Sequence, residues 1–169
     1  GWSLPGGGSA WPDPLALVAA LGDPMQPLAA GLVQAAAAHG LPVVLAGGSQ
    51  MAAVWALAVA LASPQERPRL VRGIELATTA WVVGEAGSDL PLLLERIAQR
   101  FALEGPLPLQ VAGLHFRDCR SQALRDYEQG YVKEGVGAGG LALLWERCGH
   151  SPEALAVACD ALCRQWLGA

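Results

Sequence analysis

Charged residues are scarce in this sequence, and positive charge is nowhere concentrated. Of the 169 residues, 15% are charged, and the formal net charge is −4. The densest basic group is Arg67, Arg69 and Arg72, which Pro68 interrupts, and it predicts a solvated loop. Proteins that bind nucleic acid electrostatically carry clustered Lys and Arg on one face, so we expect no nucleic-acid partner.

Long apolar runs are also missing. The longest apolar stretch, residues 51–62, is shorter than the ~20 residues that a membrane-spanning helix needs. It therefore predicts a buried core helix and no membrane partner. The first residues have neither a basic start nor an apolar core, so we expect no secretory signal and a cytoplasmic location.

No arrangement of cysteine and histidine indicates a metal site. The four cysteines form no Cys-x-x-Cys pair and have no matching histidine spacing, so we expect small buried thiols in a reducing compartment and no metal. The histidines lie far apart in the sequence, although His115 directly follows a predicted strand. The cysteines are Cys119, Cys148, Cys159 and Cys163.

Apolar residues, in contrast, are abundant. Hydrophobic residues make up 53% of the chain, a high share for a free-standing domain. Some apolar surface is therefore expected to meet a partner subunit, as in a homodimer, or a missing segment.

Short apolar segments alternate with glycine turns and helical patterns. Strands are predicted at 42–46, 76–83 and 109–114, and a helix is expected to follow each of them. The first helix begins at residue 49, the second ends at about Phe101, and the third begins at Asp118. Strands that are apolar on both faces are typical of a parallel sheet covered by helices. We therefore predict an α/β fold, a Rossmann-like three-layer domain over residues 13–169 with a mainly parallel sheet flanked by helices, preceded by a flexible tail over 1–12.

Further helices are predicted from their start and stop signals. Asp13 is expected to cap a helix that ends at Gly22, and a second helix runs to about His39 with Leu28, Leu32 and residues 35–38 on or near its buried side. The chain ends with helices over 141–147 and 151–166, and Ser151 is expected to cap the second of these.

Two glycine-rich turns are candidate binding sites. In an open α/β sheet, ligands bind beyond the carboxyl ends of the strands, where glycine turns expose backbone N–H groups. Gly47 and Gly48 suit the approach of a phosphate, and Ser49 is expected to cap the next helix. A tight strand-to-helix turn needs glycine for steric reasons as well, so both interpretations remain open.

The second turn, residues 134–140, begins with an acidic residue. Its four glycines in six residues exceed what a simple turn requires. Glu134 is either a partly desolvated general base or an exposed glutamate paired with Lys133, and local sequence does not separate these two.

Residues 13–27, 45–51 and 127–140 together resemble one family. They are similar to a cyanobacterial and archaeal branch of the nicotinate-nucleotide:dimethylbenzimidazole phosphoribosyltransferases, in which this chain corresponds to the C-terminal half. The resemblance implies transfer of the phosphoribosyl group of nicotinate mononucleotide to a benzimidazole-type base, giving α-ribazole phosphate for the lower ligand of cobamides such as cobalamin. Ala46 stands where better-known members have an acidic residue.

The resemblance also implies roles for individual residues. Glu134 would be the catalytic general base, and no metal or cofactor is needed because nicotinate leaves from a pyridinium. The alternative is a non-catalytic nucleotide-binding or assembly module that retains the fold. The implied substrate-binding residues are Gly47, Gly48, Ser49, Gln50, Lys133, Gly135 and Gly137.

Overall fold

A computed structural model of the chain describes residues 13–22, 24–130 and 137–167. The expected tail over 1–12 lies outside these residues. The described elements are α1 (Pro14–Leu21), α2 (Met25–Ala38), β1 (Val43–Ala46), α3 (Ser49–Leu61), α4 (Arg67–Arg72), β2 (Ile74–Thr79), α5 (Ala80–Val83), α6 (Leu90–Arg100), β3 (Leu109–Ala112), α7 (Gln122–Glu128), α8 (Ala138–Arg147) and α9 (Pro152–Leu167).

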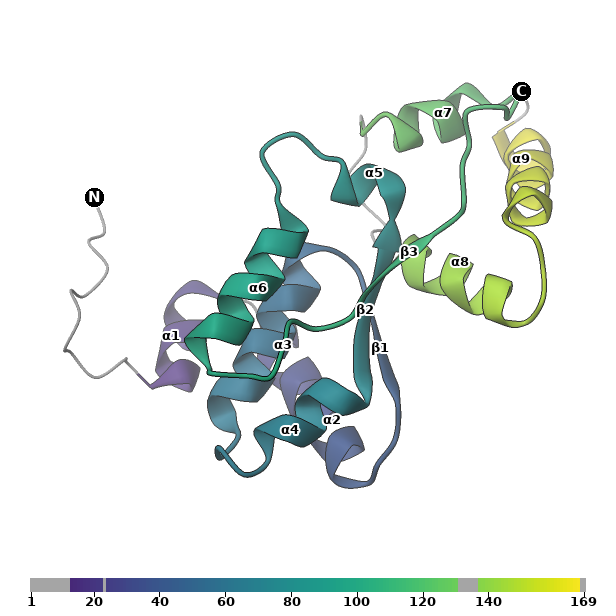
Figure 1. Cartoon of the computed structure of the whole chain (residues 1–169). Helices are drawn as coiled ribbons and strands as arrows, with labels where there is room; N and C mark the ends of the chain where they lie inside the picture. Colours follow the sequence, from purple (N-terminus) through teal and green to yellow (C-terminus); the bar gives the residue numbers. More distant parts are fainter. Residues whose placement is uncertain (1–12, 23, 131–136, 168–169) are drawn as a thin grey trace.

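In the described part of the chain, the three strands form one parallel sheet in the order β1-β2-β3. Helices α3 and α6 cover one face of the sheet, and α8 crosses the other (Figure 1). The expected α/β three-layer fold is therefore confirmed.

The larger core lies between the sheet and helices α2, α3, α4 and α6. Helix α3 is central to it, because Trp55 is fully buried and donates its indole N–H to the carbonyl oxygen of Leu70 at 3.2 Å. This confirms the expected buried helix over residues 51–62. A smaller core gathers residues of β3, α8 and α9 around Phe116.

Several predicted boundaries were wrong. Residues 80–83 form the short helix α5, because pairing between β2 and β3 ends at Thr79 and Ala112 and leaves no partner to extend the strand. The basic segment that we expected to be a loop is helix α4, with Pro68 in its first turn, where no backbone N–H is needed. Helix α7 begins at Gln122, later than predicted.

The buried side of α2 was predicted correctly for Ala37 and wrongly for the two leucines. Leu28 and Leu32 are 68% and 64% exposed, whereas Ala30, Val33 and Ala37 are buried. These smaller side chains form the face of α2 that belongs to the core it shares with α3.

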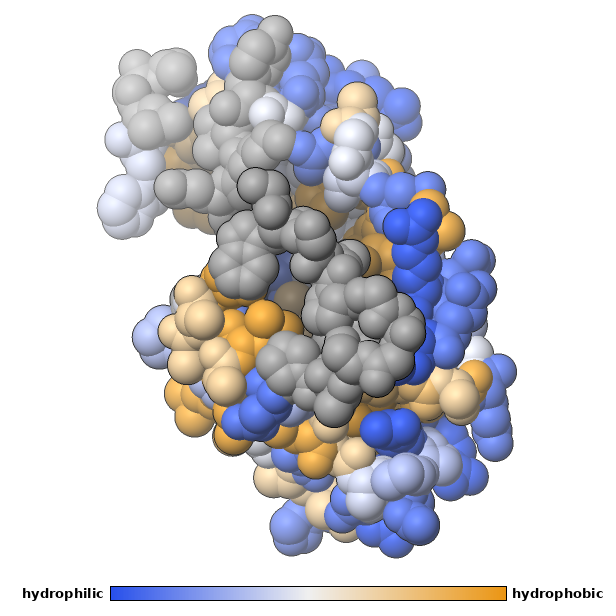
Figure 2. All heavy atoms as spheres, turned by 90° about the vertical axis from the view of Figure 1, so that its left-hand side faces the viewer, coloured by the Kyte–Doolittle hydropathy of each residue, from blue (hydrophilic) through white to orange (hydrophobic). Residues whose placement is uncertain are grey.

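Exposed hydrophobic side chains also occur on α1, which contacts α2. Figure 2 shows the side of the molecule that carries α1, where patches of hydrophobic residues (orange) lie among hydrophilic ones (blue). We call the exposed large hydrophobic residues of α1 and α2, taken together, the α1/α2 apolar face. It consists of Leu15, Leu17, Leu21, Met25, Leu28 and Leu32.

Two predicted helix caps are confirmed. The side chain of Asp13 accepts hydrogen bonds from the N–H groups of Leu15 and Ala16, and the hydroxyl oxygen of Ser151 accepts one from Ala154 at 3.2 Å. None of the helices in the described residues is long and apolar enough to cross a membrane.

Candidate functional site

A cavity of about 730 Å³ opens beyond the carboxyl ends of the strands. One wall is the turn from β1 into α3, and another is α5 with the loop that follows it. The C-terminal end of α7 and the start of α8 complete the lining. This is the place where ligands bind in open α/β sheets.

The first glycine turn is held by the sheet itself. The N–H of Gly47 donates to the carbonyl oxygen of Ala77 on β2 at 2.9 Å, which extends the strand pairing by one residue. A Cβ atom on Gly47 would lie 2.7 Å from Cγ of Met51, so glycine is needed there for steric reasons. The structural interpretation of this glycine therefore holds, although it also lines the cavity.

The residues after Gly47 present the start of α3 to the cavity. Gly48 occupies the cap position, and no side chain caps the helix, so the prediction that Ser49 is the cap was wrong. Ser49 and Gln50 are the first two residues of α3 and are exposed in the cavity wall. All four residues predicted from this turn thus line one cavity.

The second glycine-rich segment has a different structural basis. Helix α8 begins at Ala138, earlier than predicted, so Gly139 and Gly140 lie inside it. A Cβ atom on Gly139 would lie 2.3 Å from the carbonyl carbon of Thr78, and one on Gly140 would lie 2.3 Å from Cβ of Ala46. Two of the four glycines are therefore required by the close approach of α8 to the sheet.

The candidate base and two of its neighbours lie outside the described residues. These are Lys133, Glu134 and Gly135, and their segment leaves the described chain at Gly130 and rejoins it at Gly137. Gly130 and Gly137 both line the cavity, so the predicted binding residue Gly137 is placed beside the first glycine turn.

Aromatic side chains form another wall, in which sequence reasoning missed Trp81. Trp81 on α5 and Tyr127 on α7 both line the cavity and pack on Phe116 behind them. The ring centroids of Trp81 and Tyr127 are 5.6 Å apart in an edge-to-face arrangement. Burial raises the pKa of the Tyr127 phenol, which keeps the group neutral.

A carboxylate in the cavity wall fixes the end of α7. Glu128 accepts the backbone N–H of Phe116 through one oxygen at 2.5 Å, and its other oxygen lies 3.0 Å from Nδ1 of His115. Both oxygens are thus engaged in holding α7 against the segment after β3. The position of His115 after a strand was visible in the sequence, whereas its pairing with Glu128 was not.

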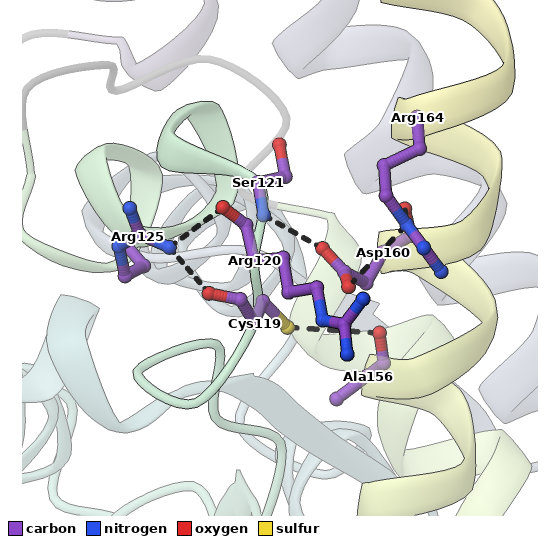
Figure 3. Close-up of polar contacts among 7 residues, drawn as sticks. All are labelled: Cys119, Arg120, Ser121, Arg125, Ala156, Asp160 and Arg164. Carbon is purple, nitrogen blue, oxygen red and sulfur yellow. Dashed lines mark hydrogen bonds and ion pairs between the residues drawn. The ribbon is translucent and has the colours of Figure 1, made fainter. Parts of the chain in front are cut away.

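The start of α7 is anchored to α9 (Figure 3). The buried carboxylate of Asp160 accepts the N–H of Ser121 at 2.8 Å, and Arg164 lies one turn further along α9 at 3.8 Å. The bond from Ser121 is the main cause that lowers the pKa of Asp160. Arg125 of α7 donates to the carbonyl oxygens of Cys119 and Arg120. The aromatic wall is therefore positioned by contacts at both ends of α7.

Within the described residues, no three His, Cys, Asp or Glu side chains are grouped so as to hold a metal ion. Cys119 is buried, and Cys159 and Cys163 are half-buried. Cys148, in contrast, is exposed, so the expectation of buried thiols was wrong for it. It follows helix α8 as the C-cap residue, where the chain turns toward α9.

Comparison with known proteins shows similarity to proteins named UPF0284. No protein-family model matches the chain. A UPF0284 protein of Prochlorococcus marinus is 48% identical over 163 residues, which cover 93% of this chain and 40% of the relative. A UPF0284 protein of Parasynechococcus marenigrum is 46% identical over 163 residues, covering 94% of this chain and 40% of the relative.

A UPF0284 protein of Gloeobacter violaceus is 46% identical over 152 residues, covering 90% of this chain and 38% of the relative. The chain thus spans about 40% of the length of the curated relatives that it matches. It is similar to UPF0284 proteins along almost its whole length.

Proposed function

We propose that this chain carries the nucleotide site of a phosphoribosyltransferase. In this proposal the phosphoribosyl group of nicotinate mononucleotide passes to a nitrogen of a benzimidazole-type base, giving the α-ribazole phosphate of cobamide synthesis. The observation that supports it is that the turn at the start of α3 and the aromatic pair Trp81 and Tyr127 line one and the same cavity. Such a cavity suits a ligand with an anionic end and a planar ring.

The proposed reaction requires one general base. The bond between C1′ of the ribose and the pyridinium nitrogen breaks, and its electron pair stays on nicotinate, which removes the ring's positive charge. A lone pair on one benzimidazole nitrogen forms the new bond to C1′. The other nitrogen gives its proton to a carboxylate.

We assign the role of base to Glu134. Glu128, the carboxylate described in the wall beside Tyr127, already accepts a backbone N–H with one oxygen and contacts His115 with the other. Taking a proton there would weaken the bonds that hold α7. Glu134 belongs to the segment between Gly130 and Gly137, two residues of the cavity wall, which favours it for this role.

The chain is proposed to act with a partner. It covers about 40% of the length of its relatives, and the α1/α2 apolar face exposes six large hydrophobic side chains. Such a face is typical of a protein contact. A second copy of the chain, or a complementing N-terminal half, would cover it.

The direct test measures nicotinate release and ligand binding together. The 169-residue chain is incubated with nicotinate mononucleotide and 5,6-dimethylbenzimidazole, and nicotinate and the new nucleoside phosphate are quantified by chromatography. We expect release that Glu134→Gln lowers by about 10²- to 10⁴-fold, the usual contribution of a general base. Glu104→Gln, at an exposed glutamate between α6 and β3, is the matched control and should retain full activity.

The outcomes separate the two candidate functions. Nicotinate mononucleotide that binds in calorimetric titration without any release would identify a non-catalytic nucleotide-binding module. Equal activity in the Glu134→Gln variant and the wild-type chain would refute the assigned base.

A further inference from the structure

The cavity has two chemically different walls, and this difference points to how a ligand lies in it. We propose that Trp81, supported edge-on by Tyr127, is the surface on which the planar heteroaromatic ring of a substrate stacks. The inference rests on the proposed function, because it assigns one wall of that same cavity to one part of the substrates.

The location of Trp81 follows from the end of the central strand. Helix α5 begins directly after Thr79 and points Trp81 toward the residues that follow β3. Its ring packs against Phe116 at a centroid distance of 5.7 Å, so one side of the indole is covered by protein. Trp81 is half-buried and is one of the residues that line the cavity.

Tyr127 fixes the orientation of the indole. Its ring meets Trp81 at an interplanar angle of 74°. Tyr127 is itself held by α7, whose end Glu128 ties to the segment after β3 and whose start Asp160 ties to α9. A planar ring that stacks on the indole therefore meets a pre-oriented surface, which reduces the entropic cost of ordering side chains on binding.

Phe116 shows that Trp81 and Tyr127 are more than core packing. All three rings belong to one cluster, with Phe116 and Tyr127 6.2 Å apart. Phe116 is buried and does not line the cavity, whereas the other two do. The cluster thus has one member that lies outside this cavity and two members that line it, and we assign the ligand contact to the latter two.

The turn between β1 and α3, which also lines the cavity, offers no aromatic side chain to a ring. Gly47 and Gly48 offer no side chain, and Ser49 and Gln50 are polar. An aromatic ring gains more binding free energy from contact with another aromatic ring than from contact with these groups. Two substrate rings are planar and aromatic and could stack there: the pyridinium of nicotinate mononucleotide and the neutral benzimidazole. The pyridinium is also attracted to an indole face through its positive charge.

The experiment titrates the 169-residue chain with three probes: nicotinate mononucleotide, benzimidazole, and ribose 5-phosphate, which has no aromatic ring. Trp81→Leu should weaken binding of one or both ring-bearing probes by about 2- to 10-fold, the range expected for loss of an aromatic contact. Trp81→Phe should retain most of that affinity. Ribose 5-phosphate should bind both variants as it binds the wild-type chain.

Phe116→Leu is the matched control, because it disturbs the same cluster without changing a cavity residue. It should lower the melting temperature and leave the affinity for all three probes unchanged. If it weakens ring binding as much as Trp81→Leu does, the effect comes from packing and the inference is overturned. Three other results would overturn the inference as well. The Trp81→Leu variant could bind the ring-bearing probes as tightly as the wild-type chain, it could lose affinity for ribose 5-phosphate in parallel, or the wild-type chain could bind none of the probes.

The same samples keep this inference separate from the proposed function. Nicotinate release is measured alongside each titration. Ring binding that depends on Trp81 without any release supports the stacking surface and counts against the transfer reaction. Nicotinate release by the wild-type chain, together with unchanged ring affinity in Trp81→Leu, supports the transfer reaction and counts against the stacking surface.

Discussion

The close approach of α8 to the sheet makes Gly139 the most sensitive small residue of the described chain. A Cβ atom there would lie 2.3 and 2.4 Å from the carbonyl carbon and Cα of Thr78, and 2.7 Å from the N atom of Thr79. These are backbone atoms of the central strand and cannot rotate away. Ordinary contact begins at 3.4 Å, so Gly139→Ala would push α8 outward by roughly 1 Å, the difference between 3.4 and 2.3 Å.

The cost of this displacement is set by the contacts of α8. The helix packs on all three strands, so moving it opens gaps along the whole face. Overpacking a core costs typically ~1–3 kcal/mol, and the better helix propensity of alanine returns ~0.4–1 kcal/mol. The middle of these two ranges leaves a net loss of about 1.3 kcal/mol, or a melting temperature lower by roughly 3–5 °C for a chain of this length.

Gly31→Ala is the matched control for the same substitution in a helix. Gly31 is exposed on α2, and a Cβ atom there would meet nothing within 4 Å. We expect this variant to be more stable than the wild-type chain by ~0.4–1 kcal/mol. Urea and thermal unfolding followed by circular dichroism measure both variants. A Gly139→Ala chain as stable as wild type, with an ordinary gain for Gly31→Ala, would refute the close packing of α8 on β2.

Two further predictions concern the anchor of α7 and the exposed face of α2. The pKa of Asp160 is lowered by its bond from Ser121, so its stabilising contribution is complete above the unfolded pKa of ~3.9 and is lost as the pH falls through the folded value. Urea titrations from about pH 6 to about pH 3 should therefore show a shallower loss of stability in Asp160→Asn, and an unchanged slope would count against the anchor. If a second copy covers the α1/α2 apolar face, replacing Leu28 and Leu32 together by Gln should reduce self-association in sedimentation while changing stability by less than ~1 kcal/mol, and an unchanged mass would exclude that partner.

Much of the local structure was determined by the sequence alone. The cap at Asp13, the cap at Ser151 and the strand, turn and helix around Gly47 depend on groups a few residues apart. A side-chain oxygen that accepts a nearby N–H, and glycines after an apolar run, act locally. The parallel sheet also followed, because the predicted strands alternate with helices and are apolar on both faces.

The tertiary structure decided which faces and which distant residues meet. Helix α2 is apolar nearly all round, so its pattern did not show that the alanine side is buried and that Leu28 and Leu32 stay exposed. The boundary between β2 and α5 depended on where β3 stops pairing.

The candidate site shows the same division. The sequence supplied the glycines of the cavity, whereas the contact between Trp81 and Tyr127 joins residues 46 positions apart, and the bond from Ser121 to Asp160 joins residues 39 apart. Contacts of this kind depend on how helices pack on a sheet, and short-range preferences of the backbone carry no information about them.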